Sequence, residues 1–542
     1  MGAETRVITW RRLDKLKPST PRGALVASAG VVMAFNIVSK LLGFTRDIVI
    51  AAFYGAARVT DAFLVAQSLS MTFIGTVGNA LGTSVLPVVT ELRVRGKRDE
   101  VRVVASTVLN LALGISAALG LLGALLAGPF TRLAATGLSP EAMALAARLA
   151  RVLFVAYILV GAGTVLGLLL NSLKEFAIPA LNPVILNIAT IAGIAWLARG
   201  LGIYAVAYGF AAGALVQFGL QALWLRRGGL PPGLAFDLGH PAVRRVLALA
   251  IPVLAGSIIG GLYTLVDNRL ASHLPEGSIS AKTYGLKLVM LPVGILVAGV
   301  STVIFPTLSE RAAKRDQAGL ADMIAFGIRT VGLITIPAAV GLAVLRVPIV
   351  RVLFQRGAWD ERASLMTAAV VLYYALGIFA LTVGPVPARA FQGMQDMVTP
   401  LAVGAAQAAV NIALDLALVG RLGLVGLAVA NVLASYLGLG VYYYLLNRRV
   451  HGIPHARLAV SLLKILAASA FMALVVSLAV PLGDRLVPST RLAVEAGKLL
   501  ALIALGGLVY LGGLIALRLD EVRSFGALLS RLARRGGETR RV

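Results

Sequence analysis

The sequence predicts an all-α membrane protein, with about fourteen transmembrane helices in two parallel-repeat lobes around a central cavity. Three observations support this prediction: an apolar composition, a series of long apolar runs, and an internal repeat. Of the 542 residues, 58% are hydrophobic and only 14% are charged, whereas a soluble domain carries about a quarter charged residues. Lipid is therefore the expected solvent of this chain.

The long apolar runs give the expected spans, because a helix needs about 20 apolar residues to cross a bilayer. The expected spans lie near 24–53, 61–90, 102–128, 141–170, 176–198, 202–225, 242–272, 279–308, 321–353, 363–393, 399–420, 422–446, 458–481 and 493–518.

An internal repeat with an offset of about 220 residues predicts the two lobes. Thr83–Glu91 is similar to Thr302–Glu310, and Leu201-Gly202 is similar to Leu422-Gly423. The offset spans an even number of helices, so both copies have the same orientation, and such parallel repeats enclose a central site in transporters. The expected parts are a basic tail (1–23), an N-lobe of helices 1–6 (24–240), a C-lobe of helices 7–12 (241–455), helices 13 and 14 (456–518) and a basic tail (519–542).

Charge sets the expected orientation. When the spans are counted, most Lys and Arg clusters fall on one side, including the loops around Arg95 and Arg315 and both termini. By the positive-inside rule this side is the cytoplasm. The stretch with Arg346, Arg351 and Arg356 is counted on the other side and departs from the rule. We expect a multi-pass protein of a bacterial inner membrane with both termini in the cytoplasm.

Composition and motifs also exclude several function classes. The net charge is +26, but the cations lie in short clusters between apolar runs and form no soluble basic domain for nucleic acid. The chain has no cysteine, which excludes disulfides and thiol chemistry. It carries no nucleotide-binding loop, zinc-protease motif or nucleophile elbow, and its loops are too short for a catalytic domain. We expect a transporter, not an enzyme.

Charged side chains inside the predicted spans mark the candidate site. Each costs roughly 2.5–3.5 kcal/mol to insert, so each needs a partner or a water-filled cavity. The first span holds Lys40, Arg46 and Asp47, and Gly43 could bend this helix so that both cations reach one cavity. Two alternatives are open: Arg46 and Asp47 as a structural ion pair near the membrane surface, and Asp61 as an acid that starts the second span.

The eighth span begins with a polar stripe, in which Ser280, Tyr284 and Lys287 recur at helical spacing. Lys287 lies far enough inside the apolar run to reach a cavity, although a lysine there could also extend to the membrane surface. Lys282 is nearer the edge of the span, and we expect its side chain to extend to the surface.

The eleventh span carries Asn411 and Asp415, which lie four residues apart on one helix face. Two oxygen-bearing side chains can bind a small hard cation such as sodium, or take part in proton transfer. An interhelical hydrogen bond is an equally good interpretation. Asp267 in the seventh span is a further candidate, either for the ion or for a pair with a charge on another helix.

Two stretches carry a resemblance to a known family. Ser39–Asp47, followed by Tyr54-Gly55 and Thr60–Phe63, resembles the opening signature of the MurJ/MviN family of lipid II flippases. Gly277–Ser280 with Lys287 is similar to the family's eighth helix. The resemblance implies a flippase that moves lipid II, a polyprenyl-diphosphate-linked peptidoglycan precursor, from the cytoplasmic to the outer leaflet by alternating access. It also implies a monomer in the bilayer that associates with cell-wall synthesis enzymes.

The resemblance further implies roles for individual residues. Those that match substrate positions are Lys40, Arg46, Asp47, Asp61, Ser280 and Lys287. The three cations among them would hold the diphosphate. Those that match sodium ligands of some family members are Asp267, Asn411 and Asp415. Sodium, protons or the membrane potential is therefore the expected drive, and no cofactor other than a coupling ion is expected.

The chain departs from the family pattern at two places. Ser70-Met71, Ile74-Gly75 and Asn79-Ala80 stand where the family has Pro-Asn, paired arginines and a Glu-Gly step, and Met290 stands where it has a glutamate. One alternative is therefore a flippase for another undecaprenyl-diphosphate-linked oligosaccharide. A multidrug cation antiporter is a second alternative, although its cavity should favour acidic over basic residues.

Overall fold

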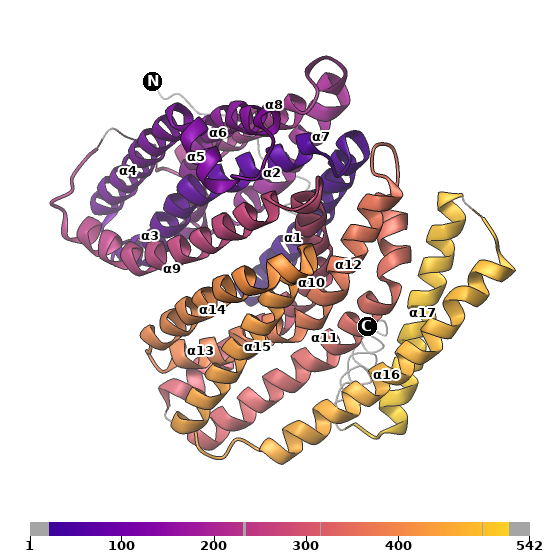
Figure 1. Ribbon diagram of the computed structural model, residues 1–542. Coiled ribbons are helices and arrows are strands. Elements are labelled where there is room, and N and C mark those ends of the chain that lie inside the picture. The colour runs from indigo at the N-terminus through magenta and orange to yellow at the C-terminus, as the bar shows by residue number, and fades with distance from the viewer. Residues whose placement is uncertain (1–20, 231–232, 234, 315, 490, 520–542) are drawn as a thin grey trace, which may run out of the picture. The chain divides into compact units, whose positions relative to one another are not determined.

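The computed structural model of the protein describes residues 21–519 apart from 231, 232, 234, 315 and 490. Most of the two expected basic tails, at 1–20 and 520–542, lies outside the described residues. Every regular element within the described part is a helix (Figure 1).

Each expected span corresponds to one helix or to consecutive helices, and the ends differ from the expected ones by at most five residues, at Ala313 and Leu486. The single helices are α1 (Pro21–Tyr54), α4 (Arg98–Leu125), α6 (Pro140–Ser172), α7 (Ala177–Leu201), α8 (Tyr204–Arg227), α9 (Pro241–Ser272), α10 (Ser278–Ala313), α11 (Gln317–Phe354), α14 (Val398–Leu422), α15 (Leu424–Arg449), α16 (His455–Leu486) and α17 (Leu492–Ala516).

The second and tenth spans are each built from consecutive helices. The second consists of α2 (Arg58–Ser70), the π-helix η2 (Met71–Gly75) and α3 (Thr76–Val94), and the tenth of α12 (Glu361–Val383) and α13 (Pro385–Gly393). A short helix, α5 (Ala127–Ala134), joins α4 to α6 and was not expected from the sequence.

Length and composition support a multi-pass membrane protein. Within the described residues, twelve of these spans are long and apolar enough to cross a membrane. The other two are α1 and α10, the helices that carry most of the candidate substrate residues.

The π-helix η2 coincides with one of the departures from the family pattern. It covers Met71–Gly75, so it contains or adjoins the Ser70-Met71 and Ile74-Gly75 steps. Residues in a π-helix are rare, and such single turns occur frequently at functional sites. The second span therefore differs in backbone geometry from a continuous α-helix.

The chain divides into two compact units. The first contains the chain up to Arg46, Ile74–Leu122 and Val152–Pro252, and the second contains Asp47–Phe73, Gly123–Arg151 and the chain from Val253. Two of the boundaries fall at features that interrupt α-helical hydrogen bonding: one lies inside η2 and another follows Pro252 in α9.

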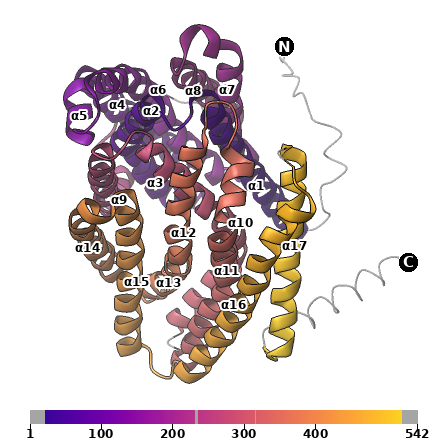
Figure 2. The same ribbon diagram turned by 45° about the vertical axis from the view of Figure 1, so that its right-hand side comes forward.

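Packing within each unit depends on close helix pairs. In the first unit, α7 packs against α8, and a Cβ at Gly193 would lie only 2.7 Å from the Cα of Gly209. In the second unit, α11 packs against α12, α14 against α15 and α16 against α17, and the last pair is visible side by side in Figure 2. Small residues permit this close approach in membrane helices.

The internal repeat is visible in local geometry. Helices α7 and α14 each have 25 residues. Each ends at a glycine with a positive φ: Gly202 has φ 54° and ψ −138°, and Gly423 has φ 57° and ψ −134°. Glycine can adopt this positive φ because it lacks the Cβ that would clash, and it is the residue most often found just after a helix end. The matching pair Leu201-Gly202 and Leu422-Gly423 therefore marks equivalent helix ends.

Candidate functional site

In the first unit, a polar side chain from α7 holds Arg46 of α1. Arg46 Nη1 donates to Asn187 Oδ1 at 3.0 Å, and Asn187 Nδ2 donates to the Ser39 carbonyl oxygen at 3.2 Å. Gly43 leaves room for this amide, since a Cβ there would lie 3.3 Å from Asn187 Nδ2. Lys40, on the same helix, is exposed. Asn187 was missed by the sequence reasoning, because a single amide in an apolar helix gives no motif.

In the second unit, Lys287 of α10 pairs with Asp47 of α1. The Lys287 Nζ lies 2.9 Å from Asp47 Oδ2, and the ammonium also lies 5.4 Å from the centre of the Tyr284 ring. The Asp47 side chain is only 6% exposed, whereas that of Lys287 is 33% exposed. A lysine so placed has a fixed partner and still offers donors to a ligand.

Asp61 and Ser280 contact each other, at the beginning of α10. Asp61 Oδ2 accepts from the Gly277 amide at 2.9 Å, and Asp61 Oδ1 accepts from the amide and the hydroxyl of Ser280 at 2.8 and 2.5 Å. These are the amides that a helix N-terminus leaves without partners, so Asp61 caps α10 from another helix. Both side chains are buried. Asp61 therefore positions α10 relative to α2.

Three glycines near this cap have left-handed backbones. Gly55, Gly277 and Gly357 have φ of 67°, 86° and 60°. A Cβ at any of them would lie 2.2–2.4 Å from a backbone carbonyl oxygen of a neighbouring segment, closer than any side chain can approach. The α1–α2, α9–α10 and α11–α12 connections therefore meet through backbone atoms, and we call these three residues the glycine turns.

Further along the second unit, Lys282 of α10 pairs with Asp267 of α9. Lys282 Nζ lies 2.5 Å from Asp267 Oδ2 and 3.1 Å from Asn268 Oδ1. All three residues are buried, at 5–7% exposure. The expectation that Lys282 extends to the membrane surface is therefore wrong, because its ammonium turns inward to a carboxylate. The interpretation of Asp267 as the partner of a charge on another helix is confirmed.

Asn411 and Asp415 of α14 form one hydrogen-bonded group with Asn431 of α15. With the Asn411 amide turned to satisfy both neighbours, its nitrogen donates to Asp415 Oδ2 at 2.6 Å and its oxygen accepts from the backbone amide of Asn431 at 3.1 Å. Asn431 Nδ2 in turn donates to the Tyr263 hydroxyl of α9 at 2.9 Å. Asp415 Oδ1 and Asn431 Oδ1 are buried and accept no hydrogen bond within the described residues.

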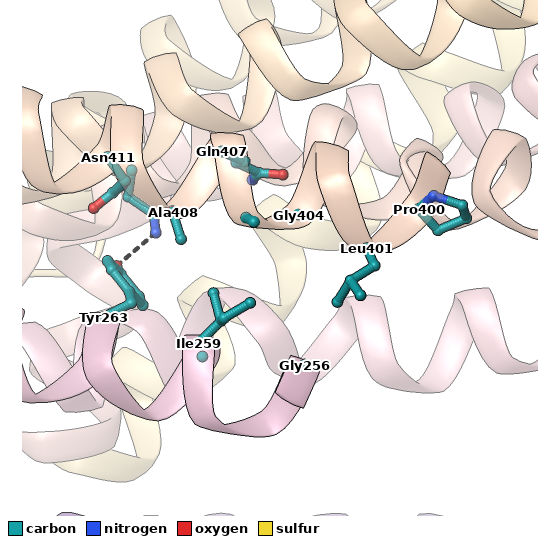
Figure 3. Close-up of a pocket in the computed structure, with 12 residues that line it drawn as sticks. Gly256, Ile259, Tyr263, Pro400, Leu401, Gly404, Gln407, Ala408 and Asn411 are labelled. Carbon is teal, nitrogen blue, oxygen red and sulfur yellow. Dashed lines mark hydrogen bonds between the residues drawn. The ribbon is translucent and has the colours of Figure 1, made fainter. Parts of the chain in front are cut away.

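A cavity of about 310 Å³ leads to this group. It lies between α9 and α14, with Tyr263 and Asn411 at one end and Leu401 and Pro400 at the other (Figure 3). Glycines at 256, 260 and 404 contribute to its wall. The buried carboxylate of Asp415 is therefore close to a space that a small ion or water could enter.

The two candidate ion-binding carboxylates differ in their partners. Asp415 keeps one carboxylate oxygen without a donor within the described residues. Asp267 is bonded to an ammonium. Within the described residues, no three His, Cys, Asp or Glu side chains gather as they would around a metal ion. Asp415 with Asn431 thus fits a sodium ion in ligand type, whereas Asp267 does not fit one while Lys282 is bonded to it.

Comparison with known proteins places these residues in context. Residues 50–488 match the family described as lipid II flippase MurJ. A probable lipid II flippase MurJ of Vibrio cholerae serotype O1 is 30% identical over 447 residues, which cover 80% of this chain and 84% of the relative.

Two solved structures are also similar. A lipid II flippase MurJ in an inward closed conformation superposes with a TM-score of 0.76 at 25% identity, over 90% of this chain and 98% of that one. An inward-facing MATE multidrug resistance transporter of the MOP superfamily superposes with a TM-score of 0.67 at 18% identity, over 78% and 98%. The second likeness concerns the fold alone.

Proposed function

Because the chain belongs to the MurJ family of lipid II flippases, we propose that it moves lipid II from the cytoplasmic to the outer leaflet by alternating access. The observation within the molecule that best supports this proposal is the Lys287–Asp47 pair. It puts a lysine side chain that is 33% exposed on α10, which corresponds to the eighth expected span, and ionised side chains inside a membrane are costly and usually functional. An anionic headgroup is the natural ligand of such a cation.

We assign the diphosphate of the substrate to Lys40, Arg46 and Lys287. Charge-assisted hydrogen bonds to phosphate oxygens are about twice as strong as neutral ones. Asn187 keeps the Arg46 guanidinium oriented through its 3.0 Å hydrogen bond, and Asp47 does the same for Lys287. Lysine offers a point charge where arginine would offer a planar fork, so Arg46 supplies the bidentate contact in this assignment.

Asp61 and Ser280 have a positioning role in this proposal. Their oxygen atoms are engaged with the N-terminus of α10. By holding this helix end, they fix the start of the helix that carries Lys287. The substrate then contacts the cations and does not contact Asp61.

For the energy source, we propose a cation, sodium or a proton, that acts at the carboxylate group of Asp415 and Asp267, in which Lys282 already pairs with Asp267. Because Asp267 is paired with Lys282, the buried carboxylate of Asp415 is the one that still demands positive charge. The buried acceptor atoms of Asp415 and Asn431 lie beside the cavity between α9 and α14, which would give a small ion a route. The membrane potential adds to this drive when the charge moves across the bilayer.

We also propose that the chain works as a monomer in a bacterial inner membrane, with both termini in the cytoplasm and cell-wall synthesis enzymes as neighbours. The basic clusters at Arg93–Arg98 and Arg311–Arg315 support this orientation. No covalent step is needed, since translocation changes the position of the lipid and not its bonds.

Rescue of bacteria depleted of their own lipid II flippase tests the proposed function. The wild-type chain should restore growth, whereas the combined Lys40→Ala, Arg46→Ala, Lys287→Ala variant should not, at equal membrane abundance. An Arg311→Ala variant, changed in the last turn of α10, is the matched control and should rescue. Failure of the wild type at adequate abundance would favour a different undecaprenyl-diphosphate-linked glycan as cargo, and rescue by the triple variant would remove the diphosphate role of the three cations.

A further inference from the structure

The buried pair of Lys282 and Asp267 gives the proposed ion site an internal cation. Lys282 Nζ contacts two oxygen atoms, Asp267 Oδ2 at 2.5 Å and Asn268 Oδ1 at 3.1 Å. Carboxylate and amide oxygens are also the ligands that a small hard cation prefers. The ammonium therefore uses the same oxygen atoms that a bound sodium ion would use.

The neighbouring residues hold these oxygen atoms toward Lys282. Asn268 Nδ2 donates to the Ser68 hydroxyl of α2 at 2.8 Å, which leaves its carbonyl oxygen facing the ammonium. The Asp267 side chain is 10% exposed and the Lys282 side chain 6%, so water contributes little to either charge. Breaking a pair of this kind leaves a buried charge without compensation, which is strongly unfavourable.

A second carboxylate, that of Asp415, belongs to the group bonded to Tyr263, which lies one helical turn before Asp267 on α9. Asp267 and Asp415 carry two negative charges when ionised, and Lys282 carries one positive charge, which is bonded to Asp267. An ammonium tethered to α10 cannot diffuse away, unlike a sodium ion. The positive charge at Asp267 is therefore a permanent part of the chain.

We propose that Lys282 is a tethered counter-ion that takes the place of a sodium ion at Asp267. This inference rests on the proposed coupling role of Asp267 and Asp415, and it deepens that role. The wild-type protein needs no sodium at Asp267, and only Asp415 remains for an exchangeable cation. Removal of the Lys282 ammonium converts Asp267, Asn268 and Asp415 into a sodium-binding group.

Sodium titration of the purified, full-length protein tests this inference. Thermal unfolding is followed in detergent while sodium chloride replaces choline chloride at constant ionic strength. A ligand that binds only the folded state raises its stability as the ligand concentration rises.

The wild type should not bind sodium at Asp267. Sodium should therefore stabilise the Asp267→Asn variant to the same extent as it stabilises the wild type. In choline chloride, Lys282→Ala should unfold at a lower temperature than the wild type, and its unfolding temperature should rise as sodium is added. Its sodium affinity should be at least about tenfold above that of the wild type.

Three variants make the result interpretable. Lys314→Ala removes an exposed lysine at the other end of α10 and should show no gain in sodium response. Lys282→Ala combined with Asp267→Asn should lose the response that Lys282→Ala gained. Lys282→Gln, purified in sodium throughout, fills the same space with a neutral amide if the alanine variant does not fold.

Two results would overturn the inference. One is a folded Lys282→Ala or Lys282→Gln protein without any sodium-specific stabilisation, which would make the pair a structural contact only. The other is a sodium response of the wild type that Asp267→Asn abolishes, which would mean that sodium binds at Asp267 despite Lys282. Neither readout requires transport, so failure of the flippase assignment would be detected separately, by the rescue of depleted cells.

Discussion

Lys282 and Lys287 lie on the same helix, and each pairs with an aspartate of another helix, yet they differ in their surroundings. The Lys282 side chain is 6% exposed and contacts both Asp267 and Asn268. The Lys287 side chain is 33% exposed and is held by Asp47. The two lysines are five residues apart, yet protein encloses Lys282 and a ligand can reach Lys287.

This difference separates two uses of a membrane-embedded cation. A fully buried pair stabilises the fold only as a pair, because either charge alone is costly in a medium of low dielectric constant. In the Lys287–Asp47 pair the carboxylate is buried and only the lysine is partly exposed, so its ammonium can exchange a carboxylate oxygen for a phosphate oxygen. Exposure, more than residue type, is therefore the basis on which we propose that Lys282 belongs to the fold and the ion site and Lys287 to the substrate site.

The largest effect is expected from breaking the buried pair. Lys282→Met should lower the free energy of unfolding by about 3–5 kcal/mol in sodium-free buffer, because Asp267 is left buried without a partner. Thermal or denaturant unfolding of the purified protein measures this loss. The double variant with Asp267→Asn should recover most of it, and a double variant as unstable as Lys282→Met would contradict a direct pair.

The cap that precedes both lysines should have the next largest effect. Asp61→Ala removes the acceptor of three hydrogen bonds at the beginning of α10, so a loss of about 2 kcal/mol in unfolding free energy is expected. Ser280→Ala loses only the hydroxyl contact and should cost less. Equal stability of Asp61→Ala and wild type would show that this cap does not stabilise α10.

Lys287, which we propose as a substrate ligand, should have a smaller effect on stability and a large effect on activity. Lys287→Ala should lower the unfolding free energy by only about 1–2 kcal/mol, because the buried Asp47 loses one partner while the lysine itself is partly exposed, but it should abolish rescue of flippase-depleted cells. Lys287→Arg, which keeps the charge, should rescue. If Lys287→Ala rescued as well as the wild type at equal abundance, the contrast between the two lysines would disappear.

The smallest effect concerns the loop that leads into α10. Hydrogen bonds from the amide and the side chain of Arg58 hold the pKa of the Glu276 carboxyl below its usual range. A carboxyl whose pKa is lower in the folded state adds stability above its unfolded pKa, and this contribution is lost as the pH falls through the folded value. Wild type should therefore unfold at a slightly higher temperature than Glu276→Gln near neutral pH, with the two converging in acid below about pH 4. A difference that persists in acid would assign the effect to another cause.

The sequence predicted the helices far better than their contacts. Hydropathy placed α10 and α14 to within a few residues, since apolar length is a local property. The partner of a charge is not local: Asp47 meets Lys287, and Asp61 meets Ser280, across more than 200 residues of chain. The periodic polar stripe on α10 indicated which residues face inward without indicating what they contact.

Lys282 illustrates the main error. Its position near the edge of the span favoured a side chain that extends to the surface, but the carboxylate of Asp267 is a stronger attraction than distant solvent. The π-helix η2 was likewise not predictable, because one extra residue in a helical turn leaves the apolar pattern almost unchanged. The unusual residues at Ser70-Met71 and Ile74-Gly75 were the available signal, and they were interpreted as a change in substrate chemistry.

The glycine turns have a practical consequence for distance spectroscopy. Gly55, Gly277 and Gly357 meet other backbone segments so closely that the three connections can hardly slide past one another. The chain has no cysteine, so spin labels can be introduced at chosen positions without a background signal. Label pairs placed beside two of these turns, at exposed positions such as Arg58 and Arg362, would give a fixed reference distance. Distances that change elsewhere during the transport cycle could be compared with it.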